Sequence, residues 1–140
     1  MISYQPTADL SKSAEITYKN MRSYYEHYSV DWNQSTVEEL IASLKNWDIL
    51  FNGTIVGAIR LAFDNSGCYV RDLQVSESYQ NKGIGAAALK ECERIAIHEG
   101  ASQLRLRVFK ISPAYRLYER NGFVVDKEEE RFYYMSRQIL

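Results

Sequence analysis

The sequence predicts a single domain of the mixed α/β (α+β) class over residues 1–140, with a mostly antiparallel sheet. Three observations support this. A chain of 140 residues is long enough for one hydrophobic core but short for two. Segments with strand and helix patterns follow in the order strand, two helices, three strands, helix, strand, helix, two strands. The pair Asn52-Gly53, a strong hairpin signal, joins two of these strands and makes them antiparallel.

The N-terminal elements follow from hydrophobic spacing. We expect a short strand at Ile2–Tyr4 and a helix from Leu10 to Tyr28. A second helix is expected from Ser35 to Asn46, with Ser35 as its cap and Glu38 completing a capping box. Its apolar residues recur every three or four positions: Val37, Leu40, Ile41 and Leu44.

The central and C-terminal elements are predicted from alternation and turn residues. Strands are expected at Trp47–Phe51, Thr54–Leu61 and Cys68–Val75. A long helix follows from Ala86 to Glu99, since this stretch lacks Pro and Gly and has an apolar stripe formed by Ile84, Ala88, Cys92 and Ile95. The remaining elements are a strand at Leu104–Phe109, a short helix after Ser112, a strand from Phe123, and a last strand containing Phe132–Met135.

Composition excludes several classes of function. The formal net charge of −1 gives no electrostatic footprint for nucleic acid or a membrane surface. No apolar run approaches the length of a transmembrane helix, and the polar N-terminus does not resemble a signal peptide. Cys68 and Cys92 are the two cysteines, and their spacing is not typical of a metal site, so we expect no metal. They indicate a reduced, cytoplasmic protein in which Cys92 belongs to the core.

The loop Gln80-Asn81-Lys82-Gly83-Ile84-Gly85-Ala86 is the most informative stretch of the chain. It joins a strand to the long helix, and its two glycines let the backbone approach a ligand closely. The first N–H groups of a helix have no internal partners, and the helix dipole adds partial positive charge there. This combination favours a phosphate or pyrophosphate.

Several interpretations of the loop compete. A Walker-type loop is excluded because its glycine spacing and its Gly-Lys-Ser/Thr ending are absent. The run Gly83–Ala88 formally satisfies the dinucleotide pattern G-x-G-x-x-A, but the strand Leu104–Phe109 runs into Lys110, where an acidic residue is expected. A turn without ligand also fits. A third phosphate-loop pattern is Q-x-x-G-x-G, which resembles the acetyl-CoA pyrophosphate loop of the GNAT superfamily of N-acyltransferases.

A second motif near the C-terminus resembles the same family. The segment from Ser112 to Phe123 reads SPAYRLYERNGF and is similar to the family pattern N-x-A-x-x-L-Y-x-x-x-G-F, with Ser112 where Asn is common. Physically it is a short helix: Ser112 is expected as its N-cap, Pro113 suits the first turn, and Gly122 ends it.

The resemblance implies a fold, a reaction and a cofactor. It implies a twisted sheet of six to seven strands flanked by about four helices, with strands splayed beside the phosphate loop. It implies transfer of an acetyl group from acetyl-CoA to a primary amine of a small molecule or peptide. The positions that it assigns to acetyl-CoA binding are Leu73, Gln74, Val75, Gln80, Asn81, Lys82, Gly83, Ile84, Gly85, Ala86, Ser112 and Tyr115.

The resemblance also suggests catalytic residues. Tyr118 matches the family's tyrosine, which protonates the leaving thiolate, and a phenol has a reference pKa suited to this task. A core tyrosine is the alternative. The acceptor ammonium must lose a proton, and Asp72 is the chosen base, with Tyr69, Glu26 and His27 as alternatives.

The acceptor site is expected in the first helical region. Its candidate residues are Tyr24, Tyr25, His27 and Trp32, because rings near carboxylates suit a cationic amine. An ordinary amphipathic helix fits the same residues. Arg60 and Arg71 either bind a carboxylate or phosphate on the acceptor or simply belong to the strands.

Other hypotheses remain open from sequence. One is a module of the same fold that binds acyl-CoA as a sensor without transfer, and another is a nucleotide-binding domain. The apolar strand Phe132–Met135 fits either a homodimer interface or a buried strand.

Overall fold

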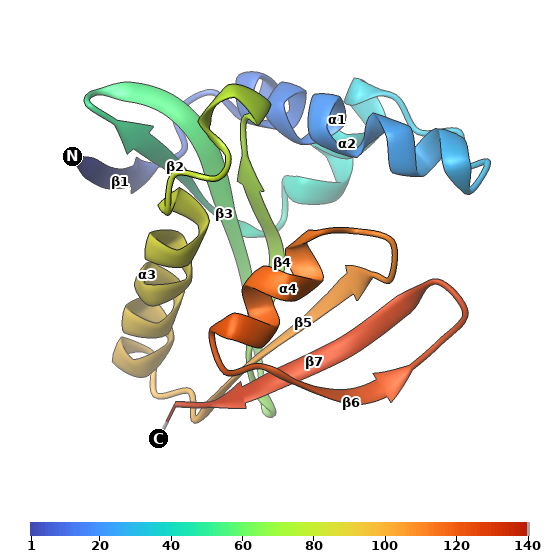
Figure 1. Ribbon diagram of the computed structural model, residues 1–140. Coiled ribbons are helices and arrows are strands. Elements are labelled where there is room, and N and C mark those ends of the chain that lie inside the picture. The colour runs from blue at the N-terminus through green and yellow to red at the C-terminus, as the bar shows by residue number, and fades with distance from the viewer. Residues whose placement is uncertain (140) are drawn as a thin grey trace. The chain divides into compact units, whose positions relative to one another are not determined.

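Seven strands and four helices, with one 3-10 turn, make up the computed structural model, which describes residues 1–139 (Figure 1). The strands are β1 (Ile2–Pro6), β2 (Lys45–Phe51), β3 (Thr54–Asp64), β4 (Gly67–Val75), β5 (Gln103–Phe109), β6 (Val124–Glu128) and β7 (Phe132–Gln138). The helices are α1 (Leu10–His27), α2 (Gln34–Ile41), α3 (Ile84–His98) and α4 (Ala114–Arg120), and the 3-10 turn is η1 (Glu77–Tyr79).

The strands form one mixed sheet in the order β1-β2-β3-β4-β5-β7-β6. The pairs β1–β2, β5–β7 and β6–β7 are antiparallel, and β4–β5 is parallel. Across the parallel pair, Cys68–Val70 lie opposite Leu104–Leu106. A seven-stranded, mostly antiparallel sheet with four helices in residues 1–139 confirms the predicted fold class. The splaying of strands beside the phosphate loop stays a prediction.

The hairpin between β2 and β3 is built as its sequence predicts. Asn52 and Gly53 have φ of +52° and +84°, the left-handed conformation that both central residues of a type I′ turn require. Glycine meets this requirement without steric cost and asparagine tolerates it, so the turn fixes the register of the two strands.

The chain divides into two compact units. The first contains residues 1–60 and 72–85, and the second contains residues 61–71 and 86–139. In the first unit α1 and α2 lie side by side, and Ala14, Tyr25, Val37 and Ile41 form a buried cluster (Figure 1). The elements β3, β4 and α3 each contribute residues to both units. The assignment of residues 1–140 to a single domain stays a prediction.

In the second unit the two faces of β5 differ sharply. Leu104, Leu106 and Val108 are buried, whereas Arg107 between them is exposed and Arg105 is half-buried. This period of two places the apolar residues on one face of the strand and the arginines on the other.

The second helix is shorter than its apolar spacing predicts, which corrects the expected range Ser35–Asn46. It ends at Ile41, and Leu40 is 50% exposed. Asn33 is the cap in place of Ser35, and its side-chain oxygen accepts a hydrogen bond from the amide of Thr36 at 2.9 Å. Asn46 ends the helix, because its side-chain amide donates to the carbonyls of Ile41 and Leu44.

Both cysteines are buried and reduced. Cys68 and Cys92 are each 0% exposed. Burial raises the pKa of the Cys68 thiol to about 11 and raises that of Cys92 as well. Cys92 is therefore a core residue, as its position on the helix predicts. Within residues 1–139 no helix is long and apolar enough to cross a membrane.

Candidate active site

The loop before α3 has left-handed backbone at two of its residues. Asn81 and Gly83, on either side of Lys82, have φ of +61° and +80°. Left-handed residues in such loops turn successive N–H groups into a concave surface that binds anions. A Cβ added at Gly83 would have no atom within 4 Å, so the space around this glycine is open. Ile84, the first residue of α3, is 1% exposed and anchors the helix start.

The end of β4 is held by two side-chain amides, one from the loop and one from α1. Gln80 and Asn20 each donate to the carbonyl oxygen of Val75, both at 2.9 Å. Asn20 also donates to the side-chain oxygen of Gln74 at 3.1 Å. Gln80 and Gln74 are both predicted to contact acetyl-CoA, and both also take part in the hydrogen bonds that fix the end of β4. Leu73, the residue before Gln74, is half-buried.

A glycine on β3 fixes the path of the same strand. A Cβ added at Gly57 would overlap the carbonyl oxygen of Gln74 and crowd Ile49. The amide of Ser76 donates to the carbonyl of Val56 at 2.7 Å, beside this close approach. Only glycine fits at residue 57. A glycine inside a strand often signals a close backbone approach, and this signal was present in the sequence.

Arg60 is the centre of a buried polar network in the first unit. Its guanidinium is 0% exposed and donates to Asp72 at 2.6 Å. Three more of its N–H groups donate to Thr17 and Ser13, each at 2.6 Å, and to Asn46 at 2.8 Å. Because the Arg60 side chain is fully buried and bonded to four internal groups, the interpretation in which it binds the acceptor is wrong.

Asp72, the predicted base, is held at both oxygens. One oxygen accepts from Arg60, and the other accepts from the side-chain amide of Gln74 at 2.6 Å. The side chain remains 18% exposed. Sequence reasoning selected Asp72 but missed its ion pair with Arg60, because Arg60 lies twelve residues earlier, on β3.

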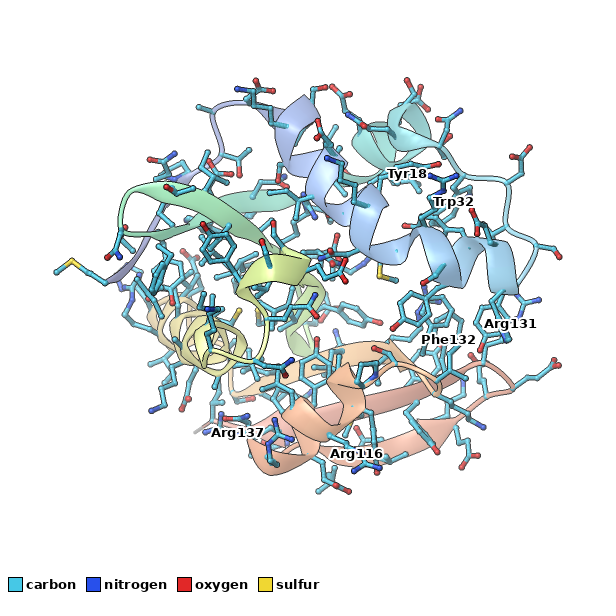
Figure 2. All side chains as sticks on the ribbon, turned by 45° about the horizontal axis from the view of Figure 1, so that its top comes forward. Tyr18, Trp32, Arg116, Arg131, Phe132 and Arg137 are labelled. Carbon is cyan, nitrogen blue, oxygen red and sulfur yellow. The ribbon has the colours of Figure 1, made fainter. Side chains whose placement is uncertain are left out.

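The predicted acceptor residues are partly brought together. Tyr25 is buried, and its ring lies 6.5 Å from that of Tyr18 and 5.3 Å from that of Trp32; the last two are labelled in Figure 2. Burial, and next the charge of Asp72, raise the pKa of Tyr25 to about 12 against the opposing effect of Arg60. Tyr24 is half-buried and has contacts of its own.

His27 does not join these rings. It is exposed, and its ring stacks edge-on against Tyr28 at 4.7 Å. The sequence grouped His27 with Tyr25 because rings near carboxylates suit a cationic amine, but residues two positions apart do not face each other on a helix.

Helix α4 carries the second motif. Tyr118 is 7% exposed, and its ring lies edge-on to that of Phe123 at 5.7 Å. Tyr115 donates its hydroxyl hydrogen to Glu119 at 3.1 Å, a bond that raises the pKa of its phenol. The expectation that Ser112 caps the helix is off by one residue: Pro113 is the cap, and the Ser112 hydroxyl accepts from the amide of Ala114.

Comparison with known proteins identifies the family. Residues 14–123 match the model of the acetyltransferase (GNAT) family. The chain belongs to the GNAT family. This match covers both the loop Gln80–Ala86 and the α4 motif, so the family resemblance drawn from these two segments is confirmed.

Among the relatives of this GNAT chain is the uncharacterized N-acetyltransferase CT2212 of Chlorobaculum tepidum. The two are 27% identical over 104 residues, which are 73% of this chain and 63% of the relative. The chain thus spans less than two thirds of the length of that protein.

Solved structures share the fold over the whole chain. PaiA N-acetyltransferase from Thermoplasma acidophilum, crystallised in complex with coenzyme A, has a TM-score of 0.73 and 19% identity, with 99% of each chain covered. A GNAT family acetyltransferase from Elizabethkingia anophelis with acetyl-CoA bound has a TM-score of 0.76 and 18% identity, with 98% of this chain and 97% of that chain covered. At this identity the likeness shows the GNAT fold alone.

Proposed function

We propose that this protein transfers an acetyl group from acetyl-CoA to a primary amine of a small molecule or peptide. The observation that carries the proposal is the loop from Gln80 to Ala86, which supplies open, left-handed backbone at the start of a 15-residue helix, in a chain of the GNAT family. The N–H groups of Lys82 through Ala86 would hold the pyrophosphate of acetyl-CoA, and the main chain of Leu73–Val75 would pair with its pantetheine arm.

The reaction is a direct displacement at the thioester. The nitrogen lone pair of the amine attacks the carbonyl carbon, a C–N bond forms, and the C–S bond then breaks with its electron pair on sulfur. Tyr118 would donate its phenolic proton to that thiolate. Its buried position on α4 supports this role, because burial keeps water from replacing it as the acid.

The acceptor must reach the reaction as a neutral amine. Asp72 is the proposed base, acting through water, since its side chain is 18% exposed and a carboxylate has lone pairs beyond the two that Arg60 and Gln74 occupy. Tyr25 and Trp32 would form an aromatic wall on the acceptor side, with Tyr24 and His27 nearby in sequence.

Two measurements test the function in order. Melting temperature is first followed against acetyl-CoA and NAD, because a ligand that binds only the folded state raises it by mass action. Thiol release from acetyl-CoA is then measured over a panel of primary amines. A rise with acetyl-CoA alone followed by thiol release supports transfer, whereas binding without release from any amine indicates the acyl-CoA sensor. A rise with NAD and none with acetyl-CoA would overturn the loop assignment.

The acid is tested by Tyr118→Phe. We expect kcat to fall about 100-fold or more while the melting shift with acetyl-CoA is retained, since general acid catalysis typically contributes this much. Tyr133→Phe is the matched control, because Tyr133 is a half-buried tyrosine of the same unit that lies outside the positions predicted to bind acetyl-CoA. Equal rates for Tyr118→Phe and the wild type would exclude Tyr118 as the acid.

A further inference from the structure

One face of the sheet in the second unit gathers three arginines among aromatic rings. We call it the arginine face, and its members are Tyr69, Arg71, Arg105, Arg107, Phe132 and Tyr134. The strand register brings them together: Arg105 is opposite Tyr69 on β4, and Arg107 is opposite Tyr134 on β7. Arg137 lies on the other face of β7 and pairs with Glu93 of α3; Figure 2 labels it together with Phe132.

The guanidinium groups are held by rings more than by carboxylates. Arg71 and Arg105 lie over the ring of Tyr69 at 5.6 and 5.4 Å, and Arg107 lies over Phe132 at 4.0 Å. Such contacts orient a guanidinium through its flat face and do not use the N–H donors, which lie in the plane of the guanidinium. Within residues 1–139, neither Arg71 nor Arg107 has an ion pair or a side-chain hydrogen bond, and both are exposed.

Arg105 adds a buried donor without a partner. Its Nη2 group donates to Asp64 at 2.6 Å, but its Nε–H is buried and makes no hydrogen bond within the described residues. Leaving a buried donor without a hydrogen-bond partner is unfavourable, so a ligand that accepts a hydrogen bond from it gains affinity. Glu129 is a second carboxylate on which Arg107 acts electrostatically, and it already accepts from the Tyr134 hydroxyl at 2.6 Å and pairs with Lys127 at 3.5 Å.

We propose that the arginine face binds an oxyanion, a carboxylate or a phosphate, carried by the amine that accepts the acetyl group. Three guanidiniums and the ammonium of Lys127, which lies over the Tyr134 ring, face the carboxylates of Asp64 and Glu129, so this face has an excess of positive charge that favours an anionic ligand. Arg71 stands two residues before Leu73 in β4, the strand proposed to pair with pantetheine. The assignment of the oxyanion to the acceptor rests on the proposed function, whereas the binding of an oxyanion does not.

The binding itself is tested by NMR of the arginine side chains. Protein labelled with ¹⁵N is saturated with CoA, so that the CoA phosphate site is filled, and titrated at constant ionic strength with inorganic phosphate or with acetate. We expect saturable shifts of the Nε–H signals of Arg71, Arg105 and Arg107, and none for the exposed Arg94 and Arg116. Saturation with only one anion identifies which oxyanion binds. Shifts that grow linearly and equally for all five arginines would overturn the proposal.

Variants keep the test independent of folding. Arg107→Gln and Arg71→Gln remove exposed side chains, so both proteins should fold, and each should weaken anion binding about tenfold or more. Arg116→Gln, an exposed arginine on α4, should leave binding unchanged. Equal anion affinity in Arg107→Gln and the wild type would contradict the assignment.

The acceptor assignment is tested with matched amines. Tyrosine is compared with tyramine, and phosphoethanolamine with ethanolamine, by thiol release from acetyl-CoA. We expect kcat/KM to be about tenfold or more higher for the anionic member of at least one pair, and the difference to shrink in Arg107→Gln. Equal rates within each pair would overturn the assignment to the acceptor. Saturable anion binding without thiol release from any amine would instead overturn the proposed function and leave the oxyanion site standing.

Discussion

Removing the charge of Asp72 should destabilise this protein far more than removing a surface carboxylate. In Asp72→Asn the shape of the side chain is kept, but the Arg60 guanidinium, 0% exposed, loses its counter-ion. Removing one partner of a buried ion pair costs about 3–5 kcal/mol. Three neutral oxygens, from Ser13, Thr17 and Asn46, still accept from Arg60, so we expect the lower end, about 3 kcal/mol.

Urea unfolding measures this loss. With a slope of about 2 kcal/mol per molar, a loss of about 3 kcal/mol lowers the urea midpoint by about 1.5 M. Glu26→Gln is the matched control, because Glu26 pairs with Arg22 at 3.0 Å in the same unit but both side chains are more than 60% exposed. Such a helix pair contributes about 0.3–0.5 kcal/mol.

A double variant separates the cost of a buried charge from simple loss of contacts. Asp72→Asn combined with Arg60→Met removes the uncompensated charge, and replacing a buried pair as a whole is often far less damaging than breaking it. The double variant should therefore be at least as stable as Asp72→Asn alone. A midpoint of Asp72→Asn within about 0.5 M of the wild type, corresponding to about 1 kcal/mol, would refute the reasoning. A double variant whose losses simply add would refute it as well.

Three further predictions follow from local geometry. Gly57→Ala should lower the free energy of unfolding by about 2 kcal/mol or more and weaken acetyl-CoA binding, because the added Cβ overlaps the Gln74 carbonyl. Gly83→Ala should lower it by about 1 kcal/mol, because the space around residue 83 is open but its φ is +80°. Urea unfolding midpoints compare the two variants. Since the pKa of Tyr25 is raised to about 12, the stability that its neutral phenol contributes should be complete below pH about 10 and disappear as the pH rises through about 12. In an absorbance titration, Tyr25→Phe should lack one phenol that titrates late in the wild type. Loss of a phenol that titrates at the ordinary pKa would contradict this. Cys68 and Cys92 should react with an aromatic disulfide reagent only after unfolding, and rapid labelling of the native protein would contradict their burial.

The sequence predicted most elements because their signals are local. The type I′ turn at Asn52-Gly53 depends on residues within the turn, and the apolar spacing of α3 reports its own buried face. Both GNAT motifs could likewise be read directly, since a phosphate loop is made of consecutive backbone groups. The end of α2 was predicted wrongly because it depends on a distant residue. Asn46 donates to the carbonyls of Ile41 and Leu44, and its side-chain oxygen accepts from Arg60, fourteen residues away.

By itself, the sequence determined the fold class, the family and the loop proposed to hold acetyl-CoA, since each depends on residues that are close along the chain. The tertiary structure alone decided what Arg60, Asp72 and Arg105 do. Arg60 looked like a candidate for acceptor binding until its buried partners from α1 and β4 were known, and the unpaired Nε–H of Arg105 depends on which strands lie beside it. Whether a charged side chain is paired or available is set by neighbours distant in sequence, and no local pattern records them.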